Sequence, residues 1–191
     1  MAGNADEISP EAAIHPTAEI EPGVTLLAGT RVWRRAHVRA GATVGRDCTI
    51  GANVFIDRNV RIGDRVKIQN NVSVYEGVEL SDDSFVGPAA VFTNDRNPRA
   101  TGEWQLTGTH VGRGASVGAN ATLVCGVSLG EHSLVAAGAV VTRSVLPHQL
   151  VQGNPAVPAG WVCRCGVVVS RSESRPFELR CEDCSHQRAP Q

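Results

Sequence analysis

Four cysteines lie in two close pairs near the C-terminal end of the sequence, and their spacing suits a metal ion. The pairs are Cys163 with Cys165 and Cys181 with Cys184, and fifteen residues lie between them. Four thiolates at short range favour a tetrahedral zinc ion, and such a site leaves no open position for catalysis. The spacing therefore predicts a small structural zinc knuckle, with four free thiols as the alternative.

The rest of the chain follows a six-residue repeat that must position any other site. Aliphatic or aromatic residues recur every six positions from Ile14 to Phe92, and the count resumes from Val111 to Val141. A small or branched residue usually follows four positions later, and Gly, Asn or Asp often follows three positions later. Because Gly, Asn and Asp tolerate positive φ, each unit is predicted to be a short strand ended by a sharp corner.

A period of six fits neither an amphipathic α-helix nor a hairpin strand. It fits a parallel β-solenoid, in which three corners bring every eighteenth residue back to the same face. The aliphatic ladder then fills the interior, in agreement with an aromatic content of only 4%. The predicted domains are a polar lead-in (1–13), an all-β solenoid (14–146), a turn-rich linker (147–160) and a Cys-rich extension (161–191).

One segment, residues 93–110, interrupts the repeat and is predicted to be a corner loop. Loops of this length without structure of their own are usually functional. Stacking by eighteen places Arg58, Glu76 and Asn94 in one corner column, with Arg113 continuing it beyond the loop. Glu76 and Asn94, at the root of the loop, are candidate site residues, whereas Arg58 alone is more typical of a solvated corner.

Several motifs around the loop are more specific than the repeat itself. They occupy residues 67–78, 86–88, 91–94, 97–99, 118–122 and 124–126. Together they resemble the nucleotide-linked 3-amino-sugar N-acetyltransferases, most closely those that act on UDP-2-acetamido-3-amino-2,3-dideoxyglucuronate. The resemblance covers the chain from Ile14 to Pro155. It implies a left-handed parallel β-helix of the hexapeptide-repeat type and a homotrimer with its sites between adjacent subunits.

The resemblance also implies the reaction, which is acetyl transfer from acetyl-CoA to the 3-amino group of a UDP- or dTDP-linked amino sugar. In this family the asparagine that matches Asn94 lies at the reacting amine, and no side chain is an obligatory base. Holding a free amine against the thioester and stabilising the oxyanion is then the main task. Glu76 could accept a proton or a hydrogen bond. The predicted substrate contacts are Tyr75, Asn71, His37 and Arg99.

Coenzyme contacts are predicted near the C-terminal end of the solenoid. Ala137 and Gly138 are small enough to let a pantetheine arm approach the backbone, and Arg143 could meet a phosphate. Asn154, in a turn that matches the family, completes this set. Simple packing of small corner residues is the alternative for the alanine and the glycine.

Other readings remain open. His110, at the end of the loop, could be a general base, as histidines are in other hexapeptide acyltransferases, or a bystander. The acceptor could be a 4-amino sugar or a small molecule, or the chain could be a non-catalytic trimeric solenoid. A relative of the γ-carbonic anhydrases would need three zinc-binding histidines, and the six histidines here do not fall on matching corners.

Composition excludes some partners. Eighteen basic residues against nineteen acidic ones give no field that attracts nucleic acid. The sequence has no apolar run long enough to cross a membrane and no basic leader, so a cytoplasmic protein is expected. Thiols stay reduced there, and Cys48 is predicted to belong to the core, whereas Cys125 lies at a corner.

Overall fold

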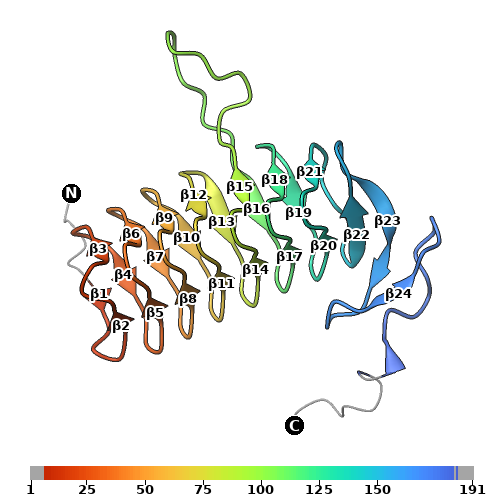
Figure 1. The fold of residues 1–191 in the computed structure, drawn as a ribbon, viewed down its shortest axis with the longest axis horizontal. Coiled ribbons are helices and arrows are strands. Elements are labelled where there is room, and N and C mark those ends of the chain that lie inside the picture. The colour runs from red at the N-terminus through yellow and green to blue at the C-terminus, as the bar shows by residue number, and fades with distance from the viewer. Residues whose placement is uncertain (1–6, 183, 185–191) are drawn as a thin grey trace.

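The computed structural model describes residues 7–182 and 184, and these form a β-solenoid (Figure 1). Short strands stack along the long axis, one loop projects from the side, and a C-terminal segment lies at one end. The predicted all-β solenoid is confirmed. Residues 1–6 of the predicted lead-in, and residues 183 and 185–191 of the predicted Cys-rich extension, lie outside the described residues.

Three sheets form the faces of the solenoid. Sheet A contains β1 (Glu7–Ile8), β4 (Thr25–Leu26), β7 (Thr43–Val44), β10 (Arg61–Ile62), β13 (Val78–Leu80), β16 (Thr109–Val111) and β19 (Ser128–Leu129). Sheet B contains β2 (Ala13–Ile14), β5 (Arg31–Val32), β8 (Thr49–Ile50), β11 (Lys67–Ile68), β14 (Phe85–Val86), β17 (Ser116–Val117), β20 (Leu134–Val135), β22 (Gln149–Gln152), β23 (Val157–Val162) and β24 (Val168–Ser170). Sheet C contains β3 (Glu19–Ile20), β6 (His37–Val38), β9 (Phe55–Ile56), β12 (Ser73–Val74), β15 (Val91–Phe92), β18 (Thr122–Leu123) and β21 (Val140–Val141).

The register of these strands follows directly from the repeat. Before the loop, each strand pairs in parallel with the strand eighteen residues later, as Arg61 does with Glu79. Across the loop the separation is larger, and Val91 pairs with Thr122. The chain passes from sheet B to sheet C at one edge, the B–C corner, and from sheet C to sheet A at another, the C–A corner.

The repeat also explains the interior and the corners. The aliphatic ladder is buried from Leu26 to Val141, with Phe92 as its largest fully buried side chain, and Ile14 and Ile20 are only partly buried at its N-terminal end. Cys48 belongs to this core as predicted, and burial raises the pKa of its thiol to about 11. Corner residues adopt positive φ where the sequence places asparagine, such as Asn53 (57°) and Asn71 (61°).

The solenoid extends past both predicted boundaries. β1 pairs in parallel with β4, so the solenoid begins within the predicted lead-in, because Ile8 occupies the aliphatic position six residues before Ile14. At the other end, β22 pairs in parallel with β20 and continues sheet B into the predicted linker. The irregular loop is residues 93–108, so His110 lies in β16 and not at the end of the loop.

The C-terminal segment closes sheet B with two antiparallel strands. β23 pairs with β22, and β24 pairs with β23. The Trp161 indole N–H donates to the Ser172 carbonyl oxygen at 3.1 Å, and the Arg171 guanidinium donates to the Ala159 carbonyl oxygen at 3.2 Å. The solenoid is thus capped by chain that no longer follows the six-residue repeat.

Candidate active site

The C–A corner brings Glu76 and Asn94 together, as stacking by eighteen predicts. The Asn94 side-chain N–H donates to the main-chain carbonyl oxygen of Glu76 at 3.3 Å. The Glu76 carboxylate accepts a hydrogen bond from the Asn59 side chain at 3.0 Å, and its backbone N–H donates to Asp57 at 3.4 Å. Both Glu76 and Asn94 are partly exposed, so a substrate can reach them.

Arg113 does not continue this column, and its predicted place there is wrong. The loop lengthens one coil, so residues on either side of it stack 31 positions apart, and Arg113 pairs with Asp82 at 3.2 Å. The register that pairs Val91 with Thr122 instead places Cys125 directly beyond Asn94, and Arg143 follows on the next coil.

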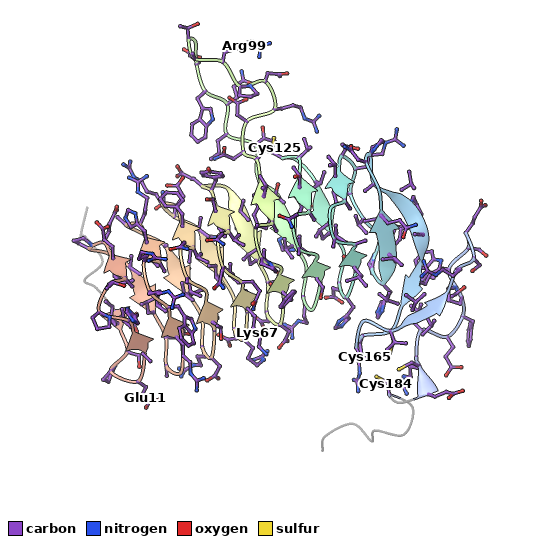
Figure 2. The ribbon with its side chains drawn as sticks, in the orientation of Figure 1. Glu11, Lys67, Arg99, Cys125, Cys165 and Cys184 are labelled. Atoms are coloured by element: carbon purple, nitrogen blue, oxygen red, sulfur yellow. The ribbon has the colours of Figure 1, made fainter. Side chains whose placement is uncertain are left out.

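The loop is anchored at its root on Asn94 and Cys125. The Thr107 backbone N–H donates to the Asn94 carbonyl oxygen at 2.9 Å and closes the base of the loop. The Arg96 guanidinium donates to the Cys125 carbonyl oxygen at 3.3 Å, and the Cys125 N–H donates to Thr93 Oγ1 at 2.9 Å. Cys125 is fully buried at the root of the loop (Figure 2), so its thiol is not available for chemistry.

The outer part of the loop points away from the solenoid. Arg99 lies in this outer part (Figure 2), where its guanidinium donates to the neighbouring Pro98 carbonyl oxygen at 2.7 Å. Trp104 is 54% exposed, and Leu106, which lies nearer the base of the loop, is 48% exposed. The structure therefore keeps Arg99 away from the Asn94 corner of its own chain.

His37 and Tyr75 are linked along sheet C by ring contacts. The His37 ring meets Phe55 edge-on, with centroids 5.6 Å apart, and Phe55 lies 6.0 Å from the Tyr75 ring. His37 Nε2 lies 3.0 Å from a carboxylate oxygen of Glu21. These contacts fix the imidazole in a row that leads toward the loop root, which is compatible with the predicted substrate contacts.

A chain of charges runs beside this row. Arg39 bridges Glu21 at 3.3 Å and Asp57 at 3.0 Å. The Ala40 backbone N–H, together with His37 and Arg39, lowers the pKa of the Glu21 carboxyl although partial burial opposes the shift. This network ends next to the loop root, because Asp57 also accepts the Glu76 backbone N–H.

A hollow of about 230 Å³ lies on sheet A beside the loop root. Its lining residues are Gly77, Glu79, Gly108, Thr109, His110, Gly126, Val127 and Ser128. Gly77 adopts a φ of 88°, and a Cβ at this position would lie 3.1 Å from the Leu106 side chain. Glycine thus permits both the corner and the close approach of the loop.

His110 lines this hollow and faces a carboxylate. Its Nδ1 lies 3.8 Å from an oxygen of Glu79. From the sequence, His110 could be either a general base or a bystander, and its pairing with Glu79 was not predicted. The signal was present in the repeat, since Glu79 and His110 share one outward row of sheet A once the loop is counted.

Three of the predicted ligand contacts lie on the B–C corner, not on the C–A corner. Asn71 accepts a hydrogen bond from the Asn53 side chain at 2.8 Å, and Gly138 donates its backbone N–H to Ala119 at 2.8 Å. Ala137 is exposed beside Gly138. The width of sheet C therefore separates Asn71, Ala137 and Gly138 from Asn94 within one chain.

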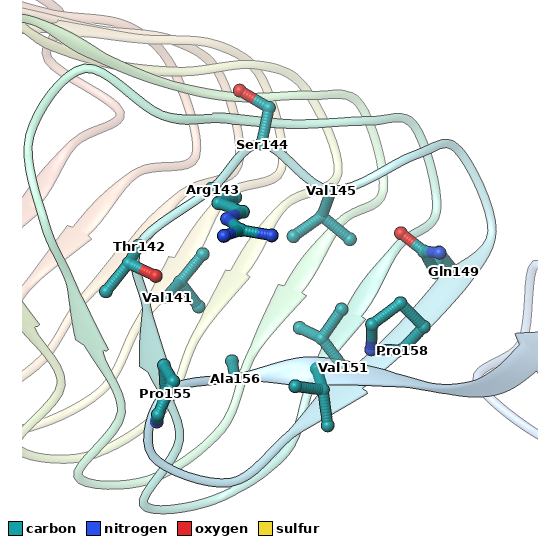
Figure 3. A pocket seen from close by; sticks show the side chains of 11 residues that line it. Val141, Thr142, Arg143, Ser144, Val145, Gln149, Val151, Pro155, Ala156 and Pro158 are labelled. Carbon is teal, nitrogen blue, oxygen red and sulfur yellow. The ribbon is translucent and has the colours of Figure 1, made fainter.

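Arg143 lies on the same corner as Asn94, two coils further along. At about 4.8 Å per stacked strand this is roughly 10 Å. Arg143 lines a cavity of about 310 Å³ at the end of the solenoid, with Pro155 and Ala156 on the opposite side (Figure 3). Asn154 lies beside β21, since Val140 exchanges backbone hydrogen bonds with Gly153 and Ala156 at 2.9 and 2.8 Å.

The four cysteines of the C-terminal segment come together as predicted. Their sulfur atoms all lie within 4.8 Å of one another, and Cys165 is the exposed member. Burial opposes ionisation of Cys163, but backbone N–H groups of Cys165 and Cys181 lower its pKa to about 6. The neighbouring thiols raise the pKa of Cys184 to about 12.

Comparison with known proteins agrees with the repeat. Residues 20–58 and 41–76 match the family described as hexapeptide repeat of succinyl-transferase. Residues 108–143 match the bacterial transferase hexapeptide family of six repeats. The two matches leave out residues 93–107 of the loop and the C-terminal segment, so they bear on the solenoid alone.

One curated relative is named as an amino-sugar enzyme. The dTDP-3-amino-3,6-dideoxy-alpha-D-galactopyranose 3-N-acetyltransferase of Aneurinibacillus thermoaerophilus is 49% identical over 57 residues. This alignment covers 30% of the present chain and 30% of the relative. The chain thus matches less than a third of that relative's length.

Solved structures share the fold. A hexapeptide-repeat acetyltransferase from Vibrio cholerae, complexed with acetyl coenzyme A, has a TM-score of 0.56 and 27% identity over 63% of this chain and 70% of its own. A maltose O-acetyltransferase from Clostridium difficile has a TM-score of 0.57 at 20% identity, over 62% and 67% of the two chains. The solenoid is therefore a left-handed β-helix of the hexapeptide-repeat type.

The described residues also bear on membrane insertion. Among them, no helix has the length and apolar character needed to span a bilayer.

Proposed function

We propose that this hexapeptide-repeat chain is an acetyl-CoA-dependent N-acetyltransferase that acts on the 3-amino group of a UDP- or dTDP-linked amino sugar. The observation that carries the proposal is the placement of Asn94 and Glu76 at the root of the loop, beside the hollow lined by Gly77 and His110. The named activity of the relative from Aneurinibacillus thermoaerophilus supports the acceptor class. The product would serve the synthesis of a surface polysaccharide or another glycoside.

The corner suits a reaction that depends on positioning. The sugar amine attacks the thioester carbonyl carbon, the tetrahedral intermediate loses the coenzyme A thiolate, and the proton lost by the nitrogen is taken up by the leaving sulfur or a nearby acceptor. Asn94 contributes by orientation, since its side-chain N–H is held by the Glu76 carbonyl oxygen and its Oδ1 can accept from the amine. The Glu76 carboxylate, at the same corner, would accept the released proton.

A trimer would bring the separated residues together. The predicted contacts lie on two corners of one chain, with Asn71 on one and Asn94 on the other. In a closed three-fold arrangement the C–A corner and loop of one subunit can face the B–C corner of the next. The exposed Trp104 and Leu106 would then be covered, and Arg99 could reach a sugar carboxylate from the neighbouring chain.

The outward row of sheet C supports this arrangement. From Phe55 onward it contains no charged side chain and continues through Ser73, Val91, Thr122 and Val140. Sheet A instead carries Arg61, Glu79 and His110 in its outward row. A face without charges is better suited to a subunit contact. Analytical ultracentrifugation should give the mass of three chains of 20.2 kDa each, and a monomer would contradict the arrangement.

Acetyl-CoA would lie along the C–A corner. Its thioester would sit near Asn94, and its phosphates would extend toward Arg143 and the end of the solenoid, where Asn154 directly precedes Pro155 of the cavity lining. Ala137 and Gly138 would meet the coenzyme of the adjacent site across the subunit boundary. The reaction would take place in the cytoplasm, where thiols stay reduced.

The His110–Glu79 pair favours a second candidate mechanism. A histidine 3.8 Å from a carboxylate at the edge of a hollow is the arrangement of a general base, and other acceptors such as a 4-amino sugar or a small molecule would suit it equally. The two mechanisms differ in the residue on which turnover depends. Asn94→Ala and His110→Ala therefore separate them directly.

The deciding experiment is a thiol-release assay with acetyl-CoA and a panel of UDP- and dTDP-linked 3-amino and 4-amino sugars. We expect release with a 3-amino sugar, and loss of that release in Asn94→Ala but not in His110→Ala. Loss only in His110→Ala would establish the second mechanism. No release with any acceptor, including small amines, would favour a non-catalytic solenoid.

A further inference from the structure

The C-terminal segment contains a cluster of sulfur atoms that the acetyl-transfer site does not use. Its members come from two places in the chain, Cys163 and Cys165 just after β23, and Cys181 and Cys184 near the end of the described residues. Three of the four are buried, and Val169 is the only other hydrophobic residue packed against them among the described residues. Sulfur therefore provides nearly all of this small core.

The spacing of the sulfur atoms matches a tetrahedral zinc ion. Four sulfurs bound at about 2.3 Å from zinc lie about 3.8 Å from one another. In the structure all four lie within 4.8 Å, and the Sγ atoms of Cys165 and Cys181 are 3.4 Å apart. A ring of four thiols around one point is not the geometry of two separate disulfides, in which sulfurs pair at about 2.05 Å.

The backbone around the first pair is already shaped for a metal. The Gly166 backbone N–H donates to the Cys163 carbonyl oxygen at 2.8 Å, and the Cys163 backbone N–H donates to the Val167 carbonyl oxygen at 2.8 Å. Gly166 adopts a φ of 89° with open space around it, so the chain reverses directly after Cys165. This turn directs both cysteines of the pair toward the same point.

The packing of the C-terminal segment does not by itself stabilise it in a fixed position. Residues 171–180 contain no strand or helix, and Phe177 is fully exposed. A chain segment with so few buried apolar groups cannot offset the entropy lost on ordering. Small units of this kind are commonly held by a metal or by disulfides.

We propose that Cys163, Cys165, Cys181 and Cys184 bind one zinc ion, and that this ion holds the C-terminal segment against the end of the solenoid. All four positions of the metal are taken by thiolates, so the ion is structural and performs no step of the reaction. β23 connects the metal site to the cavity at the end of the solenoid. Its last residue precedes Cys163, and its first two residues, Val157 and Pro158, line the cavity. The metal thereby stabilises one wall of that cavity.

The C-terminal end should depend on the metal for its stability, whereas the solenoid should not. The solenoid has a continuous core of its own, from Val24 to Val151, and none of the cysteines in the cluster belongs to that core. Removing the ion should therefore loosen β23, β24 and the chain beyond them while the coils before β22 stay folded.

Metal content tests the proposal first. The full chain, purified with reductant and without chelator, should contain about one zinc per chain, and Cys184→Ser and Cys165→Ser should each lower this content at least about fivefold. Cys48→Ser is the matched control, since the Cys48 thiol donates to the Gly63 carbonyl oxygen at 3.1 Å and a hydroxyl can do the same. Cobalt added to the metal-free chain should give the thiolate-to-cobalt absorption and visible bands of a tetrahedral site.

Hydrogen exchange then locates the effect. Chelation should raise exchange at residues 157–182 and leave residues 25–141 protected, and zinc should restore the protection. A metal-free chain in which the four thiols of the cluster are free, and in which zinc addition leaves the exchange unchanged, would overturn the proposal. So would a mass that is lower by four hydrogens, because it would show two disulfides in place of the metal site. These readouts do not depend on acetyl transfer.

Discussion

The Asn94 side chain is bound to the main chain of Glu76 and not to its carboxylate. The donor is Asn94 Nδ2 and the acceptor is the Glu76 carbonyl oxygen, 3.3 Å away, while the Glu76 carboxylate is bound separately by Asn59. The two side chains at the loop root are therefore held independently. A substitution of either one tests its own chemistry without removing the support of the other.

Asn94→Ala should lower kcat about 100-fold or more, because it removes the group that orients the reacting amine. The lost hydrogen bond is partly exposed and should cost only about 1 kcal/mol of unfolding free energy. Steady-state thiol release and a thermal melt of the same preparation measure the two effects. Near-normal turnover in a folded variant would remove Asn94 from the site.

Asn97→Ala is the matched control for that variant. Asn97 lies in the same loop and is exposed, and its contact with Asp95 is made by its backbone N–H, which alanine keeps. We expect its kcat to stay within about twofold of the parent chain, since surface substitutions away from special features change little. An equal loss in both variants would point to the loop as a whole and not to the Asn94 side chain.

Glu76→Gln should lower kcat about tenfold or more and leave KM nearly unchanged. Glutamine keeps the shape and the backbone support of Asn94, but it cannot accept the proton that the amine releases. A pH profile of kcat in the parent and the variant is the measurement. An unchanged kcat would show that the leaving sulfur or water accepts the proton, and that Glu76 has no part in turnover.

Gly77→Ala should lower both stability and activity. Its φ of 88° costs an alanine about 1 to 2 kcal/mol, and the new methyl group would press on Leu106, which lies at the base of the loop. Gly23→Ala carries similar strain, with φ at 82° and only the Gly41 nitrogen at 3.8 Å, but it lies far from the loop. We expect similar thermal shifts in the two variants and a loss of kcat/KM in Gly77→Ala alone. Equal activities would show that the loop adapts to the methyl group.

His132 should make the fold less stable in mild acid. Burial, followed by the neighbouring charge of His148, lowers the pKa of His132 below the ordinary 6.5, although Glu131 and Asp83 oppose the shift and Arg164 adds to it. Between these two pKa values the unfolded chain binds a proton that the folded chain does not. The contribution of neutral His132 to the free energy of unfolding is therefore complete above about pH 6.5, and it is lost as the pH drops through the lower, folded-state pKa.

Melting temperatures measured from about pH 8 to about pH 5 check this dependence. In His132→Asn the decline below pH 6.5 should be smaller, and asparagine suits the position because His132 has a φ of 54°. His15→Asn is the control, since its ring is exposed and far from His148. A decline of the same size in His132→Asn would assign the acid sensitivity to other groups.

The sequence determined the solenoid because a repeat constrains every coil in the same way. Inward Val, Ile and Leu and corner Asn and Gly recur often enough to set period, register and core, and the pairing of Arg61 with Glu79 follows by counting. The meeting of Asn94 with Glu76 was predictable for the same reason. So was the gathering of the four cysteines, since close pairs of this type commonly bind one ion.

Tertiary structure alone decided which residues stack on either side of the loop and how far apart the corners of one coil lie. Counting by sixes could not supply the extra length of the interrupted coil, so Arg113 was misplaced and the His110–Glu79 pair was missed. Residues close in sequence, such as Gly138 and Arg143, fall on different corners because a strand of sheet C lies between them. Local periodicity fixes stacking within a column, whereas the distance between columns depends on how the coil closes around its core.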